Sequence, residues 1–237
     1  MEMLRDPVSS GSHFLAAFLA LIASCFLFRI TSRNTTRRIC VLIFGSSMTI
    51  LFTSSGLYHA LRLPPDELKV YQLIDMSAIF LMIAGGATPL AALLVRGRLR
   101  WALLIGEWTL AFIGIASLWM FPLPDHSILV GCYVGMAWLS CAGFYAYWCA
   151  TGWRGMRWFI GAMGTYLLGA VIEVANWPVV WTGLIRSHEL LHFCDIAGTA
   201  CYLVFLVHYI LPYHPGKVVK PSRAIRGAAS VSVPVEA

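Results

Sequence analysis

Apolar stretches of close to 20 residues recur along nearly the whole chain of 237 residues, and short polar breaks separate them. A helix needs about 20 apolar residues to cross the hydrocarbon core of a bilayer, so this pattern predicts membrane-spanning helices. The breaks carry arginines, Pro and Gly, or tryptophan, which are typical of turns and membrane interfaces. The predicted fold class is therefore all-α: a polytopic membrane protein with a seven-transmembrane-helix bundle. The predicted spans are 12–30, 38–61, 72–95, 101–120, 127–150, 157–176 and 188–211.

These spans divide the chain into an N-terminal segment (1–11), one transmembrane domain (12–211) and a flexible tail (212–237). No loop is long enough to hold a soluble domain. The composition agrees, because 59% of the residues are hydrophobic and 12% are charged, whereas soluble domains carry about 25% charged residues. The seven cysteines lie inside apolar stretches without CxxC spacing, so we expect small buried residues and neither a disulfide framework nor a thiolate metal site.

The distribution of positive charge predicts the orientation in the membrane. The net charge of +6 lies in the breaks and the tail, so it requires no nucleic-acid partner. Of the 17 lysines and arginines, 13 lie at or just after the ends of the first, third and fifth spans or in the tail. Since cytoplasmic loops are enriched in Lys and Arg, the tail is predicted to be cytoplasmic and the N-terminus outside. We expect an integral protein of the plasma (inner) membrane, with membrane lipids as its surroundings.

Ionisable residues at bilayer depth cost about 2.5–3.5 kcal/mol on insertion scales, so each needs a reason. Seven spans place the end of the second and the starts of the third and seventh on one side. His59 lies in the last turn of the second span, and Asp75 about one turn into the third. His188 and His192 lie in the first two turns of the seventh, about 40° apart on a helix, so both rings can reach one ion.

Three neutral imidazoles with one open position form a catalytic zinc arrangement, so Zn2+ is the expected cofactor. Asp75 could take a proton from a zinc-bound water or orient that water. Ser55 precedes His59 by four residues and lies on the same helix face, so its hydroxyl could bond the water, Asp75 or a substrate oxygen. Asp195 follows His188 by seven residues and is a candidate for supporting the ligands from behind.

The order of these residues along the chain resembles the progestin and adipoQ receptor family, and most closely its bacterial hemolysin III branch. The similar elements are Ser55-x-x-x-His59, Asp75 early in the third span, His188-x-x-x-His192 opening the seventh, and Asp6-Pro7-Val8-Ser9-Ser10 leading to His13-Phe14. They cover the chain from about Asp6 to Leu211.

The resemblance implies zinc at His59, His188 and His192, with Asp75 and Ser55 beside the metal. It also connects the chain to the alkaline ceramidase superfamily, whose members hydrolyse a lipid amide with a similar residue set. Two features depart from the family. Its adiponectin-receptor members have the N-terminus inside, whereas the charge distribution here places it outside. Asp195 is an additional carboxylate that the family pattern does not explain.

Other interpretations of the same residues stay open. His188 to His192 also spells the H-E-x-x-H motif of metalloproteases, with Glu189 as the base. A carboxylate in the first turn also interacts favourably with the helix dipole, and Ser187 could cap the helix. We favour the dipole role for Glu189, because Asp75 is the better placed base under the resemblance. The histidines could also pack the bundle as hydrogen-bonded imidazoles without a metal.

Three further ionisable residues receive weaker expectations, and two receive none. Glu107, near the inner end of the fourth span, is expected to reach the lipid headgroups. Glu173, near the outer end of the sixth, is expected to make either an interhelix contact or a substrate contact. His208 is expected to be interfacial, and neither His13 nor His126 is assigned a role.

The function expected from these residues is metal-dependent hydrolysis of a lipid-like amide or ester. Asp75 would handle the proton, Ser55 and the metal would stabilise the developing oxyanion, and substrate would enter from the bilayer. The competing class is a receptor or membrane-stress sensor with a structural zinc site. A cytolysin and an intramembrane metalloprotease are minor alternatives. A structural site would have its fourth position filled by protein, and a catalytic site would leave it to water.

Overall fold

The computed structural model describes residues 4–214, and this part of the chain is helical without a β-strand. The predicted all-α membrane fold is confirmed, while residues 215–237 of the predicted tail lie outside the described residues. The elements are α1 (Pro7–Ile30), α2 (Thr35–Ala60), α3 (Pro65–Leu94), α4 (Gly97–Met120), α5 (His126–Leu139), the 3₁₀ segment η1 (Ser140–Gly143), α6 (Phe144–Ala175), α7 (Ser187–Phe205) and the π-helical segment η2 (Leu206–Ile210).

The helices begin earlier than the predicted spans, and in two of them, α1 and α3, a proline opens the helix. Pro7 starts α1 and Pro65 starts α3, whereas the predicted spans begin at 12 and 72. Proline suits the first helical position, since its φ is already helical and the N–H it lacks would have no partner there. Pro64 precedes α3 as its N-cap. The segment that was expected to be a turn therefore forms the entry to α3.

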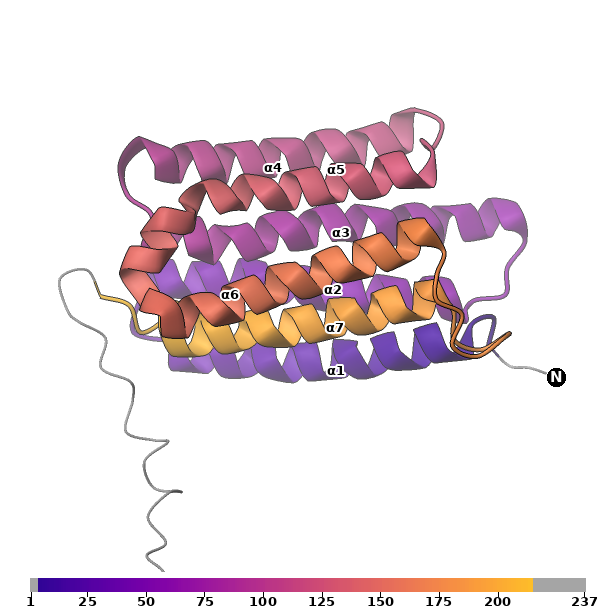
Figure 1. The fold of residues 1–237 in the computed structure, drawn as a ribbon, viewed down its shortest axis with the longest axis horizontal. Helices are drawn as coiled ribbons and strands as arrows, with labels where there is room; N and C mark the ends of the chain where they lie inside the picture. The colour runs from indigo at the N-terminus through magenta and orange to yellow at the C-terminus, as the bar shows by residue number, and fades with distance from the viewer. Residues whose placement is uncertain (1–3, 215–237) are drawn as a thin grey trace, which may run out of the picture.

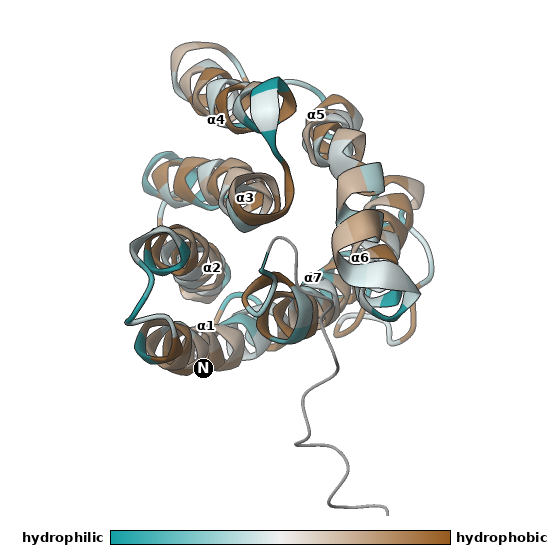
Figure 2. Cartoon of the chain, turned by 90° about the vertical axis from the view of Figure 1, so that its left-hand side faces the viewer, coloured by the Kyte–Doolittle hydropathy of each residue, from teal (hydrophilic) through white to brown (hydrophobic). Residues whose placement is uncertain are grey.

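The helices run along a common direction and pack in order around the bundle (Figures 1 and 2). α1 packs on α2, α2 on α3 and α3 on α4, while α6 packs on α7 and α7 contacts α1. At the contact between α2 and α3, Gly85 lies directly against Ser47, where a Cβ would collide with the serine side chain. Small residues of this kind let helix backbones approach closely within a membrane.

The interior and the outer surface are both apolar, which distinguishes this bundle from a soluble one. Phe44, Phe159 and Phe205 are fully buried between the helices. On the outside, Leu15 and Phe18 of α1 are each 61% exposed, and Figure 2 shows hydrophobic residues along much of every helix. Soluble monomers rarely expose such large apolar patches. Several helices of membrane-spanning length therefore make this an integral membrane protein.

Six stretches within the described residues are long and apolar enough to cross a membrane, where seven were predicted. The difference lies in His126–Ala175, which counts as one stretch of 50 residues. A straight helix of that length would extend about 75 Å, well beyond the roughly 30 Å hydrocarbon core.

The chain reverses direction inside that stretch. Gly152, within α6, has φ 62° and ψ −176°, a conformation that essentially only glycine adopts. Figure 1 shows the chain following α5 to one end of the bundle and returning along α6. It also shows that α1 starts and η2 ends at opposite ends of the bundle. These features support separate passes for α5 and α6, and the count of seven spans stays a prediction.

Candidate metal centre

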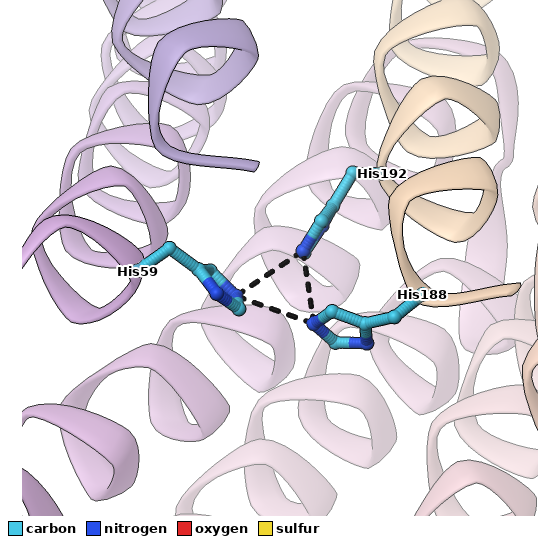
Figure 3. A group of neighbouring side chains, drawn as sticks. All are labelled: His59, His188 and His192. Atoms are coloured by element: carbon cyan, nitrogen blue, oxygen red, sulfur yellow. Dashed lines mark hydrogen bonds between the residues drawn. The ribbon is translucent and has the colours of Figure 1, made fainter. Parts of the chain in front are cut away.

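Three imidazoles from two helices converge at the end of the bundle where α1 begins (Figure 3). His59 lies in the last turn of α2, and His188 and His192 lie in the first two turns of α7. Their Nε2 atoms are 3.3 Å apart between His59 and His188, 3.2 Å between His59 and His192, and 3.1 Å between His188 and His192. His59 and His192 are buried, and His188 is partly exposed.

The spacing of the three Nε2 atoms fits one metal ion. Ligands at 2.0–2.1 Å from a tetrahedral zinc lie about 3.3 Å from one another, close to the three separations found here. The three histidines are the group of potential ligands among residues 4–214 whose atoms lie close enough to share an ion. No fourth protein ligand joins them within that range, so a tetrahedral ion would keep one open position.

Carboxylates hold two of the three rings from behind. His59 Nδ1 donates to Asp6 Oδ2 at 3.0 Å, and His188 Nδ1 donates to Glu173 Oε1 at 3.1 Å. With the proton on Nδ1, the Nε2 lone pairs of both rings point into the cluster and repel one another. A cation between them would convert this repulsion into coordination. Carboxylate–histidine pairs of this kind fix the tautomer and raise the basicity of a metal ligand.

Asp6 holds His59 through both its backbone and its side chain. The Asp6 N–H donates to the carbonyl oxygen of His59 at 2.9 Å, and the Arg5 N–H donates to that of Ala60 at 3.3 Å. Arg5 also donates from Nε to Asp6 Oδ2 and stacks on the Tyr58 ring. Partial burial would raise the pKa of the Asp6 carboxyl, but the hydrogen bonds from His59 and Arg5 outweigh it and hold that pKa below its ordinary value.

Glu173 connects His188 to a second histidine nearer the surface of the bundle. Its Oε1 also lies 3.0 Å from Nε2 of His126, a half-exposed residue at the start of α5. Glu173 itself is 7% exposed. Of the two roles expected for Glu173, the structure shows the interhelix contact, which joins α5, α6 and α7 at the candidate metal centre.

His192 is supported differently from the other two histidines. Its Nδ1 is buried and has no hydrogen-bond partner among the described residues. The ring of His13 from α1 lies against it, with centroids 4.2 Å apart and an interplanar angle of 70°. His13 is 2% exposed, and neither of its ring nitrogens has a partner in the described part of the chain.

Both carboxylate oxygens of Glu189, in the first turn of α7, accept hydrogen bonds from residues outside the group of three histidines. Its Oε2 accepts from the backbone N–H of Arg186 at 2.8 Å, and its Oε1 accepts from the Ser9 hydroxyl at 3.1 Å. Glu189 therefore lies in the first helical turn, where the sequence favoured an interaction with the helix dipole, and it also makes a capping contact that was not predicted for it. The N-cap itself is Arg186, one residue before the expected Ser187.

Asp75 and Ser55 lie outside the group of three histidines but close to each other. Ser55 is buried and hydrogen-bonds the Asp75 carboxyl, which also interacts electrostatically with His188. Asp195 makes no hydrogen bond or ion pair with another described residue, although its carboxylate interacts electrostatically with Asp75 and His188. The catalytic roles of Asp75 and Ser55 and the supporting role of Asp195 stay predictions.

The expectation that Glu107 reaches the lipid headgroups is wrong. Its side chain is 1% exposed, and its Oε1 accepts from the Ser140 hydroxyl at 2.6 Å. Ser140 opens the 3₁₀ segment between α5 and α6. The local hydrophobicity of α4 could not indicate this contact, because the partner lies in a helix irregularity far along the chain. His208 is exposed in η2.

The sequence interpretation missed three residues around the cluster: Asp6, His13 and His126. For Asp6 and His13 a signal was present, since Asp6, Ser9 and His13 follow the i, i+3, i+7 spacing of one helix face. Treating residues 1–11 as a segment outside the first helix concealed this periodicity. No local signal marked His126, which reaches the site through Glu173.

The fold and the cluster together define an integral-membrane helical bundle that could hold a metal ion on three histidines. Comparison with known proteins is consistent with this class. The family described as "Haemolysin-III related" matches residues 1–203, and the chain belongs to this family.

Two curated relatives match over most of both lengths. Hemolysin-3 of Bacillus cereus is 29% identical over 214 residues, covering 89% of this chain and 94% of the relative. The Hemolysin-3 homolog of Bacillus subtilis (strain 168) is 25% identical over 212 residues, covering 88% and 96%.

Proposed function

We propose that this protein is a zinc-dependent membrane hydrolase that acts on a lipid-like amide or ester. The observation that carries the proposal is the convergence of three imidazole Nε2 atoms at 3.1–3.3 Å with no fourth protein ligand among the described residues. Zinc suits imidazole ligands and tetrahedral geometry. Three histidines with an open position are the ligand set of catalytic zinc sites.

Bound zinc would supply Lewis acidity, which polarises a carbonyl and lowers the pKa of a coordinated water to about 7. The protein's own residues would prepare this chemistry. Asp6 and Glu173 fix the tautomers of His59 and His188, so that both Nε2 lone pairs face the ion. Asp75, held by the Ser55 hydroxyl, is the carboxylate proposed to accept the proton.

The location of the site favours a lipid-like substrate. His59, His188 and His192 lie on helices whose neighbours present apolar side chains to the outside. A substrate dissolved in the bilayer would therefore meet the site from within the membrane, without first entering water. Since amides and esters of lipids carry their carbonyl near the headgroup level, a metal near the end of the bundle is at a suitable depth.

The competing proposal is a receptor or membrane-stress sensor in which the metal only joins α2 to α7. Such a structural zinc site is expected to be closed by four protein ligands. The described residues provide three, which favours the hydrolase. The names of the Bacillus relatives suggest cell lysis, and lysis by a free hydrolase product would be compatible with the same centre.

The experiment compares metal content and lipid turnover in the purified full-length chain, using a panel of lipid amides and esters in mixed micelles. Asp75→Asn is expected to keep the metal and lose about 10²- to 10⁴-fold in turnover, the usual contribution of a general base. Asp66→Asn is the matched control, because Asp66 is exposed in the first turn of the same helix.

Two results would each contradict a part of this proposal. A zinc-loaded wild-type protein that turns over none of the lipids would favour the sensor. Turnover that persists unchanged in Asp75→Asn would remove Asp75 from the mechanism.

A further inference from the structure

The first two turns of α1 and the residue before them form a polar face directed at the metal cluster. Asp6, Ser9 and His13 follow one another at the spacing of one helix face. Each contacts a different part of the site: Asp6 hydrogen-bonds His59, Ser9 hydrogen-bonds Glu189, and His13 packs on His192. This face is defined here as the α1 polar face.

The contacts of this face hold the parts of two different helices, α2 and α7, that carry the metal ligands. Asp6 binds His59 at the end of α2 by a side-chain and a backbone hydrogen bond. Ser9 and Glu189 connect α1 to the first turn of α7, where His192 follows one turn later. Ser9 is fully buried, so its hydroxyl is committed to this contact. The α1 polar face therefore bridges the two helices that supply the histidines.

His13 is the member of this face whose polarity nothing else explains. It is buried between the rings of Phe52 and His192, at centroid distances of 5.4 Å and 4.2 Å. An aromatic hydrocarbon side chain would fill this position without burying two unpartnered nitrogens, and buried polar groups normally have partners. His192 Nδ1 is the third buried nitrogen at this place without a partner among the described residues. His59 and His188 each have an acceptor for Nδ1, and His192 lacks one.

We propose that the α1 polar face positions the metal ligands, and that His13 is the hydrogen-bond partner of His192 Nδ1 when the metal is bound. The inference rests on the metal centre of the proposed function. His13 does not belong to the group of nitrogens that can share the ion, so it acts through His192 and not as a ligand. His13 would accept a hydrogen bond from Nδ1 of His192, as Asp6 does from His59 and Glu173 does from His188. It would do so as a neutral ring in place of a carboxylate.

The test replaces the native metal of the full-length protein with Co2+ and measures its visible absorption spectrum and its affinity by competition with a chelator. His13→Phe keeps an aromatic ring beside Phe52 and His192 but removes the acceptor. We expect it to lower metal affinity by about 10- to 100-fold, the usual effect of losing a group that orients a ligand, and to change the Co2+ spectrum.

His13→Gln restores an acceptor and is expected to recover most of the affinity, which a packing role alone would not predict. Asp6→Asn tests the same face independently through His59 and is expected to weaken Co2+ binding as well. Phe18→Leu, at an exposed position of the same helix, should leave the spectrum and the affinity unchanged.

The outcomes separate this inference from the proposed function. If wild-type protein takes up no Co2+, the metal centre fails and the inference fails with it. If wild-type protein binds Co2+ and His13→Phe has the same spectrum and affinity, only the inference fails. Equal losses in His13→Phe and His13→Gln would also contradict it, since they would assign His13 to packing.

Discussion

At the scale of single residues, three carboxylates of this membrane protein pair with residues from distant parts of the chain. The carboxylate of Asp6 pairs with His59, and that of Glu173 pairs with both His188 and His126. The carboxylate of Glu107 accepts a hydrogen bond from Ser140. A carboxylate inside a bundle is tolerated where such partners exist. The buried carboxylates are therefore expected to contribute to stability as well as to any chemistry.

Glu107 provides a prediction that is independent of the metal. Glu107→Ala removes the acceptor of the Ser140 hydroxyl and leaves a cavity beside the 3₁₀ segment, so it should destabilise the fold by about 2–4 kcal/mol. Glu107→Gln keeps an acceptor oxygen and should cost less. Thermal unfolding in detergent measures both, with Glu67→Ala as the control, since Glu67 is exposed at the start of α3. Equal melting temperatures for wild type and Glu107→Ala would exclude this structural role.

The residues of the cluster could be predicted from the sequence, but most of their supports could not. Seven predicted spans place the end of the second and the start of the seventh on one side, and the i, i+4 spacing of His188 and His192 directs both rings to one face. These two expectations brought His59, His188 and His192 together. The partner of each ring depends on side-chain directions that hydrophobicity does not encode. Asp6 could have been found, because its spacing places it on the same helix face as His13, whereas His126 could not.

At the scale of elements, irregularities in the helices determine how the chain turns. The 3₁₀ segment η1 separates α5 from α6, and the chain changes direction at Gly152, where the backbone of α6 is not helical. The sequence predicted a break at Gly152-Trp153-Arg154 from its turn composition, and the positive φ of Gly152 explains why the break is there. Starts of helices were harder to predict, since prolines that resemble breaks are the first residues of α1 and α3.

Substitution of Gly152 tests this turn directly. A Cβ at Gly152 would meet no neighbouring atom, so any effect of Gly152→Ala comes from the backbone conformation. We expect a loss of about 1–3 kcal/mol in folding stability, the range for a residue held in such a region. Gly131→Ala in α5 is the matched control, because Gly131 is helical and its Cβ would also be unobstructed. That variant should be neutral or slightly stabilising, and an equally stable Gly152→Ala would refute the strained turn.

At the scale of the whole molecule, the bundle places the candidate metal centre at one end and most of the arginine-bearing turns at the other. The N-terminal end of α1 lies with the histidines, and Arg33 and Arg96 follow α1 and α3 at the opposite end (Figure 1). The proposed orientation puts the centre on the outer side, because positive charge marks the cytoplasmic face.

Thiol labelling distinguishes seven spans from six and tests the orientation. Asp125 precedes α5, Val179 follows α6, and Trp153 adjoins the reversal, and all three are exposed. With seven spans and the N-terminus outside, an impermeant reagent should label Asp125→Cys and Val179→Cys in intact cells but not Trp153→Cys. The chain without added cysteines provides the background, since its native cysteines lie in helices. Labelling of only one of the Asp125 and Val179 positions would show that α5 and α6 cross as a single span.

The most direct test of the metal centre is elemental analysis of the purified full-length protein beside His59→Ala and His192→Ala. A site of three convergent histidines predicts about one zinc per wild-type chain, and each variant, which keeps only two ligands, should lose nearly all of it. Wild-type protein without a stoichiometric metal, or variants that retain it, would contradict the centre on His59, His188 and His192.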